Sequence, residues 1–263
     1  MQEKASAKNQ SVEKLFSIIE VMAAEPLPMR LQDIAAAVNI PASTALRFVN
    51  TLQTIGYVRQ DPHTLRYAPT LKFTHLGAQI ASHLSLRDLV RPYLEDLANY
   101  SGECCCLAEE QDMHVVTLDV VSGQNDMLQI VRKPGARTLM HCSGVGKLLL
   151  LNRTSAELEA YTRITALKSL TPHSISSFAQ LTDALRTVRL SGYAMDDEES
   201  ALGVRSLAVP IKDYSGRAVC GISIAAPSAR FTDERVRELL PKLRETGSAI
   251  SALLGGQYPQ GSK

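Results

Sequence analysis

A break in a helical pattern between residues 31 and 60 constrains the fold of this chain more than any other feature. The segment reads LQDIAAAVNIPASTALRFVNTLQTIGYVRQ. Apolar residues recur at helical spacing over 31–38, the pattern stops at Asn39-Ile40-Pro41, and it resumes from Ala42. Because proline is tolerated in a first helical turn, the segment predicts two short helices joined by a tight turn. Gly56 is typical of the left-handed residue that ends a helix.

A further helix precedes this pair, and a hairpin follows it. Residues 11–24 carry an apolar stripe at helical spacing, with Ser11 as the predicted N-cap and the prolines of EPLP after the last turn. The predicted stripe consists of Val12, Leu15, Phe16, Ile19 and Met22. After Gly56, YVRQ and LRYAP flank the turn-forming DPHT, which predicts a β-hairpin. Three helices followed by a hairpin indicate a winged helix-turn-helix domain over residues 1–69.

The helix that starts near Ala42 has one apolar face and one polar face. We expect Ala45, Phe48 or Val49, Leu52 and Ile55 to face the core. The opposite face gathers the polar residues Ser43, Thr44, Arg47, Asn50 and Thr51.

Such polar side chains can contact bases and phosphates, and arginine is the commonest specific reader of guanine. Arg59 and Arg66 flank the hairpin turn, where cations can contact the DNA backbone. A merely solvated helix face and a protein-binding adaptor are the alternatives. The preceding tight turn and the following hairpin favour a DNA-binding face.

The rest of the chain has a different texture. Residues 70–90 form a mostly helical pattern and predict a linker helix. Residues 91–256 mix short apolar bursts, turns and amphipathic helices, which predicts an α+β domain with a largely antiparallel sheet. Residues 257–263 are expected to form a flexible tail. The chain of 263 residues is long for one compact domain, in agreement with this division.

Composition and charge indicate a water-soluble protein. The chain is 45% hydrophobic and 21% charged, and it has no apolar run long enough to span a bilayer. The polar amino terminus does not predict a secretory signal, so we expect a cytoplasmic protein without membrane association. Net charge is only +1, made of +2 over residues 1–75 and −1 over the remainder. This asymmetry adds little, because phosphate contacts need a few placed cations rather than a high total.

Five cysteines stand at positions 104, 105, 106, 142 and 220. Without an indication of export, we expect them to be reduced, and small buried apolar side chains are the simplest interpretation. On a strand, Cys104 and Cys106 share one face and Cys105 points to the other. The alternative hypothesis is a metal or redox sensor that uses Cys104–Cys106 with His141 and Cys142.

Enzyme motifs are incomplete in this sequence. SGVGK is no phosphate-binding loop, because His141 and Leu148 occupy the positions that need glycine and a hydroxyl. Ser143 does not complete a G-x-S-x-G nucleophile motif, and the carboxylates of DDEE have no evident partner. We therefore expect no enzymatic activity, no cofactor and no structural metal.

Several segments together resemble the isocitrate-lyase-regulator (IclR) family of bacterial transcription factors. They include SVEKLFSIIEVM, LMHCSGVGKLLLL and SGYAMDDEESALGVRSLAVPIKDYSGRAVCGISIAAPSARFT. The resemblance implies a winged helix-turn-helix domain followed by a GAF-like effector-binding domain. It also implies a homodimer or a tetramer built as a dimer of dimers, acting as repressor or activator on a pseudo-palindromic operator in double-stranded DNA. Ala42 departs from the family, since relatives often have a basic residue there.

The same resemblance implies a pocket for a small carboxylate metabolite in the second domain. Gly144 and Val145 would present backbone N–H groups to the anion, with Asp196 at the rim. Ser206 stands where relatives often have cysteine, and Ala225 stands where some have a second serine beside Ser223. The variable apolar wall would comprise Met127, Ile130 and Thr138.

Overall fold

The computed structural model describes residues 9–83, 85–124, 130 and 132–256, and the chain divides into two compact units, Met1–Leu84 and Ser85–Lys263. Within residues 70–90 lie the helix α4 (Lys72–His83) and the start of α5 (Leu86–Ser101). The expected domain boundaries stay predictions. Met127, proposed for the apolar wall, and the tail 257–263 lie outside the described residues.

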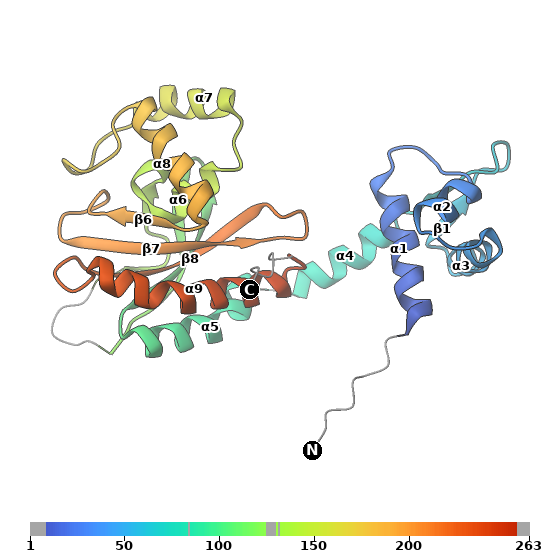
Figure 1. Cartoon of the computed structure of the whole chain (residues 1–263), viewed down its shortest axis with the longest axis horizontal. Coiled ribbons are helices and arrows are strands. Elements are labelled where there is room, and N and C mark those ends of the chain that lie inside the picture. Colours follow the sequence, from blue (N-terminus) through green and yellow to red (C-terminus); the bar gives the residue numbers. More distant parts are fainter. Residues whose placement is uncertain (1–8, 84, 125–129, 131, 257–263) are drawn as a thin grey trace, which may run out of the picture. The chain divides into compact units, whose positions relative to one another are not determined.

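The first unit has the order of a winged helix-turn-helix domain (Figure 1). Its elements before α4 are α1 (Gln10–Ala24), α2 (Leu31–Ala37), α3 (Ala42–Thr54), β1 (Val58–Gln60) and β2 (Tyr67–Pro69). The two strands pair antiparallel, as the hairpin pattern predicted. A small apolar core joins helices and hairpin, formed by Ile18, Met22, Ile34, Val49, Leu52, Val58 and Tyr67.

The turn between α2 and α3 depends on Asn39, whose φ of 54° places it in the left-handed region. Asparagine tolerates this conformation better than most residues, so the chain reverses within a few residues. The Ile40 N–H donates to the Ala35 carbonyl at 3.0 Å and closes the turn. Gly56, with φ of 80°, ends the α3 region in the left-handed conformation that the sequence predicted.

Three details of the first unit correct the sequence prediction. Ile55 is 48% exposed and does not face the core, because it already lies at the C-cap of α3. There the Lys72 ammonium donates to the Ile55 carbonyl at 2.7 Å. In α1, the N-cap is Asn9 rather than Ser11, and Val12 and Phe16 are exposed instead of buried.

The second unit is built on one six-stranded antiparallel sheet with the order β5-β4-β3-β8-β7-β6. The strands are β3 (Cys104–Gln111), β4 (His114–Val121), β5 (Arg137–Leu139), β6 (Ala194–Asp197), β7 (Val204–Lys212) and β8 (Ala218–Pro227). Neighbouring central strands β7 and β8 are joined by a short hairpin turn. All pairings are antiparallel, which agrees with the predicted α+β class.

Helices cover both faces of this sheet, and Figure 1 shows them on either side of β7 and β8. On one face, α5 and α9 (Asp233–Leu253) pack on alternate strand residues such as Leu207, Ile222 and Ile224. On the other face lie α6 (Gly144–Leu150), α7 (Ser155–Thr165) and α8 (Phe178–Ser191). The period-2 alternation of strands thus separates two apolar layers. The face under α6 also carries the polar residues discussed below.

None of the helices in the described part of the chain has the length and apolarity that crossing a membrane requires. Taken together, the elements of the two units form a helix-turn-helix domain followed by an α+β domain with an antiparallel sheet.

Candidate functional site

The exposed face of α3 carries the first candidate site. Ala45, Val49 and Leu52 are buried with at most 2% exposure, so they fix which way the helix turns. Ser43, Arg47, Asn50 and Thr51 are exposed, and Thr44 is half-buried at the edge of the same face. The structure therefore brings the five predicted residues of this helix onto one side.

Hydrogen bonding differs among these residues. The Thr51 hydroxyl donates to the Arg47 carbonyl at 2.9 Å, within the helix. The Arg47 guanidinium and the Asn50 amide have no hydrogen-bond or ion-pair partner within the described part of the chain. Arg47 and Asn50 are therefore the side chains of this face that are most available to an external ligand.

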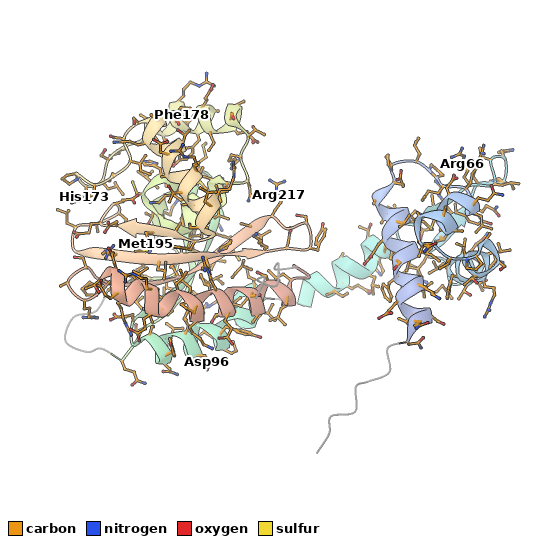
Figure 2. All side chains as sticks on the ribbon, in the orientation of Figure 1. Arg66, Asp96, His173, Phe178, Met195 and Arg217 are labelled. Atoms are coloured by element: carbon orange, nitrogen blue, oxygen red, sulfur yellow. The ribbon has the colours of Figure 1, made fainter. Side chains whose placement is uncertain are left out.

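The hairpin contributes cations that differ in availability. Arg59 on β1 is exposed. Arg66 is half-buried and donates from Nη1 to the Pro28 carbonyl at 3.0 Å, so it fastens the hairpin to the segment before α2 (Figure 2 labels its position). At the turn, the Asp61 carboxylate accepts from the N–H groups of His63 and Thr64. Hydrogen bonding by the backbone and side chain of Thr64, and by the N–H of His63, lowers the pKa of Asp61.

The second candidate site lies on the face of the six-stranded sheet that α6 covers. In the strand register, Asp196 lies opposite Ser206, Ser206 opposite Ala225, and Ala225 opposite Cys104. One row across four strands therefore contains three residues that the sequence proposed for effector binding. Ser223 lies two residues from Ala225 on the same face.

Polar groups at this face are left without partners. Ser206 and Ser223 are each 4% exposed, and their hydroxyls have no hydrogen-bond partner among the described residues. The backbone N–H groups of Gly144 and Val145, in the first turn of α6, have none there either. A β-carbon on Gly144 would lie 3.0 Å from the Ala208 side chain, next to Ser206 and Ser223 in the register. Free donors thus lie on both the helix and the sheet, an arrangement suited to an anion.

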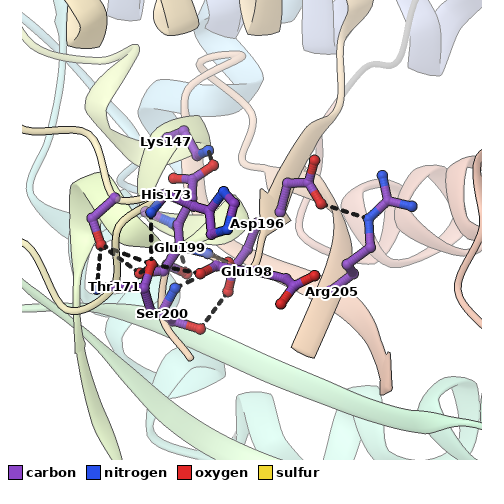
Figure 3. A network of polar contacts seen from close by, with 12 residues as sticks. Lys147, Thr171, His173, Asp196, Glu198, Glu199, Ser200 and Arg205 are labelled. Carbon is purple, nitrogen blue, oxygen red and sulfur yellow. Dashed lines mark hydrogen bonds and ion pairs between the residues drawn. The ribbon is translucent and has the colours of Figure 1, made fainter. Parts of the chain in front are cut away.

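Asp196 has a different environment from the two serines. Its carboxylate is 1% exposed and accepts from the N–H groups of Glu199 and Ser200 and from the Ser200 hydroxyl at 2.5 Å (Figure 3). By accepting these three hydrogen bonds, the Asp196 carboxylate stabilises the turn after β6. Ser200 also lines the neighbouring cavity, so the hydrogen bonds between Asp196 and Ser200 connect Asp196 to the wall of that cavity.

That cavity has a volume of about 730 Å³. Ile130 and Thr138, two of the predicted wall residues, line it together with Ser200 and Val204. Its cationic lining consists of Arg132, Arg137 and Lys168, and no carboxylate of the described residues contributes to it. A cavity lined by one sign of charge raises the local concentration of small ions of the opposite sign. The cavity therefore favours anions.

A buried ion pair connects α6 with the turn after β6. The Lys147 ammonium lies 2.5 Å from Oε1 of Glu199, and the two residues are 4% and 8% exposed. The second carboxylate oxygen of Glu199 has no hydrogen-bond partner in the described part of the chain. Burial raises the pKa of Glu199, although the ammonium of Lys147 counteracts this effect. The pair fixes the helix that carries Gly144 and Val145 relative to the turn that carries Ser200.

Sequence reasoning did not place several residues of this region. Cys104 and Cys106 share the sheet face of Ser223 and Ala225, with their sulfur atoms 3.8 Å apart. The period of the strand predicted that these two cysteines share a face, but the pairing of β3 with β8 could not be read from the sequence. No local pattern marked the cationic lining of the cavity.

The alternative metal or redox site is not assembled. His141 has both ring nitrogens engaged, Nδ1 with the Tyr161 hydroxyl at 2.7 Å and Nε2 with the Lys168 carbonyl at 3.1 Å. Burial lowers the pKa of His141, so the neutral ring accepts from Tyr161 and donates to Lys168. Among the residues that the structure describes, no three His, Cys, Asp or Glu side chains converge as metal ligands would. The geometry does not favour this alternative.

Comparison with known families matches both units. The family model described as the IclR helix-turn-helix domain matches residues 11–62. The model described as the bacterial transcriptional regulator IclR C-terminal domain matches residues 78–252, which is more than half of the chain.

Individual proteins show the same similarity along nearly the whole chain. The HTH-type transcriptional regulator KdgR of Escherichia coli is 30% identical over 250 residues, covering 95% of this chain and 94% of KdgR. The DNA-binding transcriptional repressor YiaJ of Escherichia coli is 30% identical over 251 residues, covering 95% and 89%. The crystal structure of Thermotoga maritima IclR has a TM-score of 0.62 at 29% identity, covering 94% of this chain and 99% of that protein.

Proposed function

The chain belongs to the IclR family of bacterial transcriptional regulators, and on this premise we propose that α3 reads an operator while a small organic acid bound under α6 adjusts operator affinity. Its relatives are regulators of transcription and not enzymes.

DNA recognition would use the exposed face of α3. Recognition helices contact base edges in the major groove, often with residues from their amino-terminal half. Ser43, Thr44 and Arg47 occupy that part of α3, and Asn50 follows one turn later. Arginine pairs with guanine and asparagine with adenine through two parallel hydrogen bonds. The free guanidinium of Arg47 and the free amide of Asn50 support these roles.

Thr51, Arg59 and Arg66 would complete the interface. Arg59 is exposed on the hairpin and suits a phosphate or minor-groove contact, whereas Arg66 already holds the hairpin in place. Two such domains in a homodimer, or four in a tetramer, would recognise a pseudo-palindromic site.

Effector binding would use the donors left free under α6. The observation that carries this part is that the hydroxyls of two buried residues, Ser206 and Ser223, have no hydrogen-bond partner among the described residues. They lie on the sheet face covered by the first turn of α6, whose Gly144 and Val145 N–H groups also have no partner in that part of the chain. A carboxylate can accept from all four donors. The cavity with Ile130 and Thr138 would receive the rest of the molecule, and Ala225 would leave room on the sheet face.

Charge and turn geometry support the same assignment. The cationic lining would attract an organic acid, and Asp196 would shape the site by ordering the turn that carries Ser200. An effector changes operator affinity only by its different affinity for two arrangements of the protein. The ligand would therefore favour one arrangement of the DNA-binding domains, through the helical segment 70–90.

DNA binding is tested with the full chain and a labelled fragment from the region upstream of its own gene. Fluorescence anisotropy across a salt series should show Arg47→Ala weakening binding about tenfold or more, the effect of one lost bidentate contact. Arg237→Ala is the matched control, since Arg237 is exposed on α9 and its removal changes the charge equally. Equal affinity of the two variants would refute the role of α3.

Effector binding is tested by thermal shift against sugar acids and short keto acids. One class should stabilise the protein saturably, by the mass action of ligand binding to the folded state. Ser223→Ala should remove this shift, whereas Ser215→Ala, at the exposed hairpin tip, should retain it. A shift unchanged in Ser223→Ala would contradict the proposed site and leave the α3 assignment unaffected.

A further inference from the structure

The second unit contains another cavity, of about 700 Å³, that shares no lining residue with the proposed effector cavity. It is bounded by the carboxyl-terminal ends of α6 and α8, by the hairpin of β7 and β8, and by α9. Figure 1 shows α6 and α8 on one side of strands β7 and β8 and α9 on the other. Its volume lies within the range of small-molecule sites in proteins.

The floor of this second cavity is apolar. Leu148 from α6, Val188 from α8, and Pro210 and Ala218 from the two strands line it, and each is buried in the fold. Their side chains come from four elements and are fixed by the core beneath them. A ligand with an apolar body would remove further apolar surface from water by resting on this floor.

The rim of the cavity is cationic. Arg189, Lys212 and Arg244 line it from α8, β7 and α9. Glu245 is the only carboxylate among the described lining residues, and its Oε2 is held by the Lys242 ammonium at 2.9 Å. The rim therefore presents three positive charges and one carboxylate that already has its own cation. Such a rim favours an anion.

Two of the three cationic side chains at the rim, Arg244 and Arg189, are positioned to bind an anion. Arg244 donates from Nη2 to the Ser191 carbonyl at 2.5 Å and lies over the Tyr193 ring, 5.6 Å from its centroid. These contacts orient the guanidinium and leave its other N–H groups for a ligand. Arg189 is exposed and has no hydrogen-bond or ion-pair partner in the described part of the chain.

From this combination we propose that the cavity is a second ligand site, specific for a small carboxylate with an apolar body, such as an aromatic monocarboxylic acid. The carboxylate binds Arg189 and Arg244, and the ring lies on Leu148 and Val188. The inference does not require the effector site under α6. A regulator with both sites responds to two metabolites rather than one.

The test is a titration of the full chain with benzoate, in which binding is measured by isothermal titration calorimetry and by ligand-observed NMR. Benzyl alcohol is the neutral probe of the same shape. Arg189→Glu reverses the charge of an exposed side chain without removing a contact, so it should fold like the wild type. Arg186→Glu is the matched control, because Arg186 lies one turn earlier on α8, is exposed and does not line the cavity. Ser223→Ala tests whether benzoate binds instead at the proposed effector site under α6.

We expect saturable benzoate binding to the wild type, to Arg186→Glu and to Ser223→Ala, weakened about tenfold or more in Arg189→Glu. Benzyl alcohol should bind more weakly than benzoate and equally to all four proteins. Equal benzoate affinity in Arg189→Glu and Arg186→Glu overturns the proposal. So does binding that is lost in Ser223→Ala but retained in Arg189→Glu, which would place benzoate in the effector site. The proposal is also overturned if benzoate binding does not saturate at concentrations up to about 10 mM, because a specific site would have a lower dissociation constant.

Discussion

Removing the ammonium of Lys147 should destabilise the second unit strongly. In Lys147→Met, the Glu199 carboxylate stays buried at 8% exposure and loses the cation that lies 2.5 Å from Oε1. Its other oxygen has no hydrogen-bond partner among the described residues, so the buried carboxylate is left without its counter-ion. Removing one partner of a buried pair costs about 3–5 kcal/mol. For a unit of this size, that cost lowers the melting temperature by roughly 6–20 °C.

Two further variants separate the charge from the loss of packing. Lys147→Met combined with Glu199→Leu removes both charges and should recover most of the loss, because apolar replacement of a buried pair is often neutral. Lys242→Met removes the ammonium of an exposed pair with Glu245 and should leave the melting temperature unchanged. Calorimetry or circular dichroism at pH 7 measures all four proteins.

The pH dependence gives an independent check on the same reasoning. Burial raises the pKa of Glu199 above that of the unfolded chain, so the folded state binds this proton more tightly. Stability from this group is therefore complete below the unfolded pKa of 4.5 and is lost as pH rises through the folded pKa. The deficit of Lys147→Met should thus shrink in mild acid. The reasoning would be refuted if Lys147→Met had the same melting temperature as Lys242→Met. It would also be refuted if adding Glu199→Leu to Lys147→Met did not raise the melting temperature.

Three further predictions concern the fold and the DNA contact. Gly146→Ala should destabilise the second unit by about 1–3 kcal/mol or more in urea unfolding, because its β-carbon would lie 2.2 Å from the Met140 carbonyl oxygen; unchanged stability would mean that the helix start is free to move. Thr232→Ala should cost about 1 kcal/mol in the same assay through loss of the α9 N-cap, whereas Thr182→Ala, inside α8, should cost less. Arg59→Ala should reduce the slope of log affinity against log salt by about 0.9 if Arg59 neutralises one phosphate, and an unchanged slope would place it away from the DNA backbone.

Local chemistry made the first unit predictable. Asn39 and Gly56 are residue types that tolerate the left-handed backbone at their positions, and Asp61 accepts hydrogen bonds within the hairpin turn, so the positions of these turns followed from the sequence. The errors fell at element ends and at exposed apolar residues. Ile55 continues the helical spacing of α3 but lies beyond its last turn. Phe16 continues the apolar spacing of α1, yet its side chain is 57% exposed.

The candidate effector site was predictable only in part, because its parts meet through the sheet. Residue alternation gave the shared face of Cys104 and Cys106, but the register that places them beside Ser223 and Ala225 depends on long-range pairing. Asp196 was proposed as a rim residue, and only the structure shows that its carboxylate is occupied by the following turn. A short motif such as DDEES therefore points to a segment of the chain but leaves open which of its atoms remain available to a ligand.

In the proposed DNA complex, the hydrogen bond from Thr51 to the Arg47 carbonyl would restrict which bases the Thr51 side chain can recognise. A hydroxyl has a single proton, and here the helix backbone has taken it, so only oxygen lone pairs point outward. As long as α3 stays intact, Thr51 can accept from the amino groups of adenine or cytosine but cannot donate to guanine O6 or thymine O4. Thr54, which donates to the Asn50 carbonyl at 2.9 Å, is restricted in the same way. In that proposed complex, the helix face would combine donors that favour guanine at Arg47 with acceptors that disfavour guanine one turn further on.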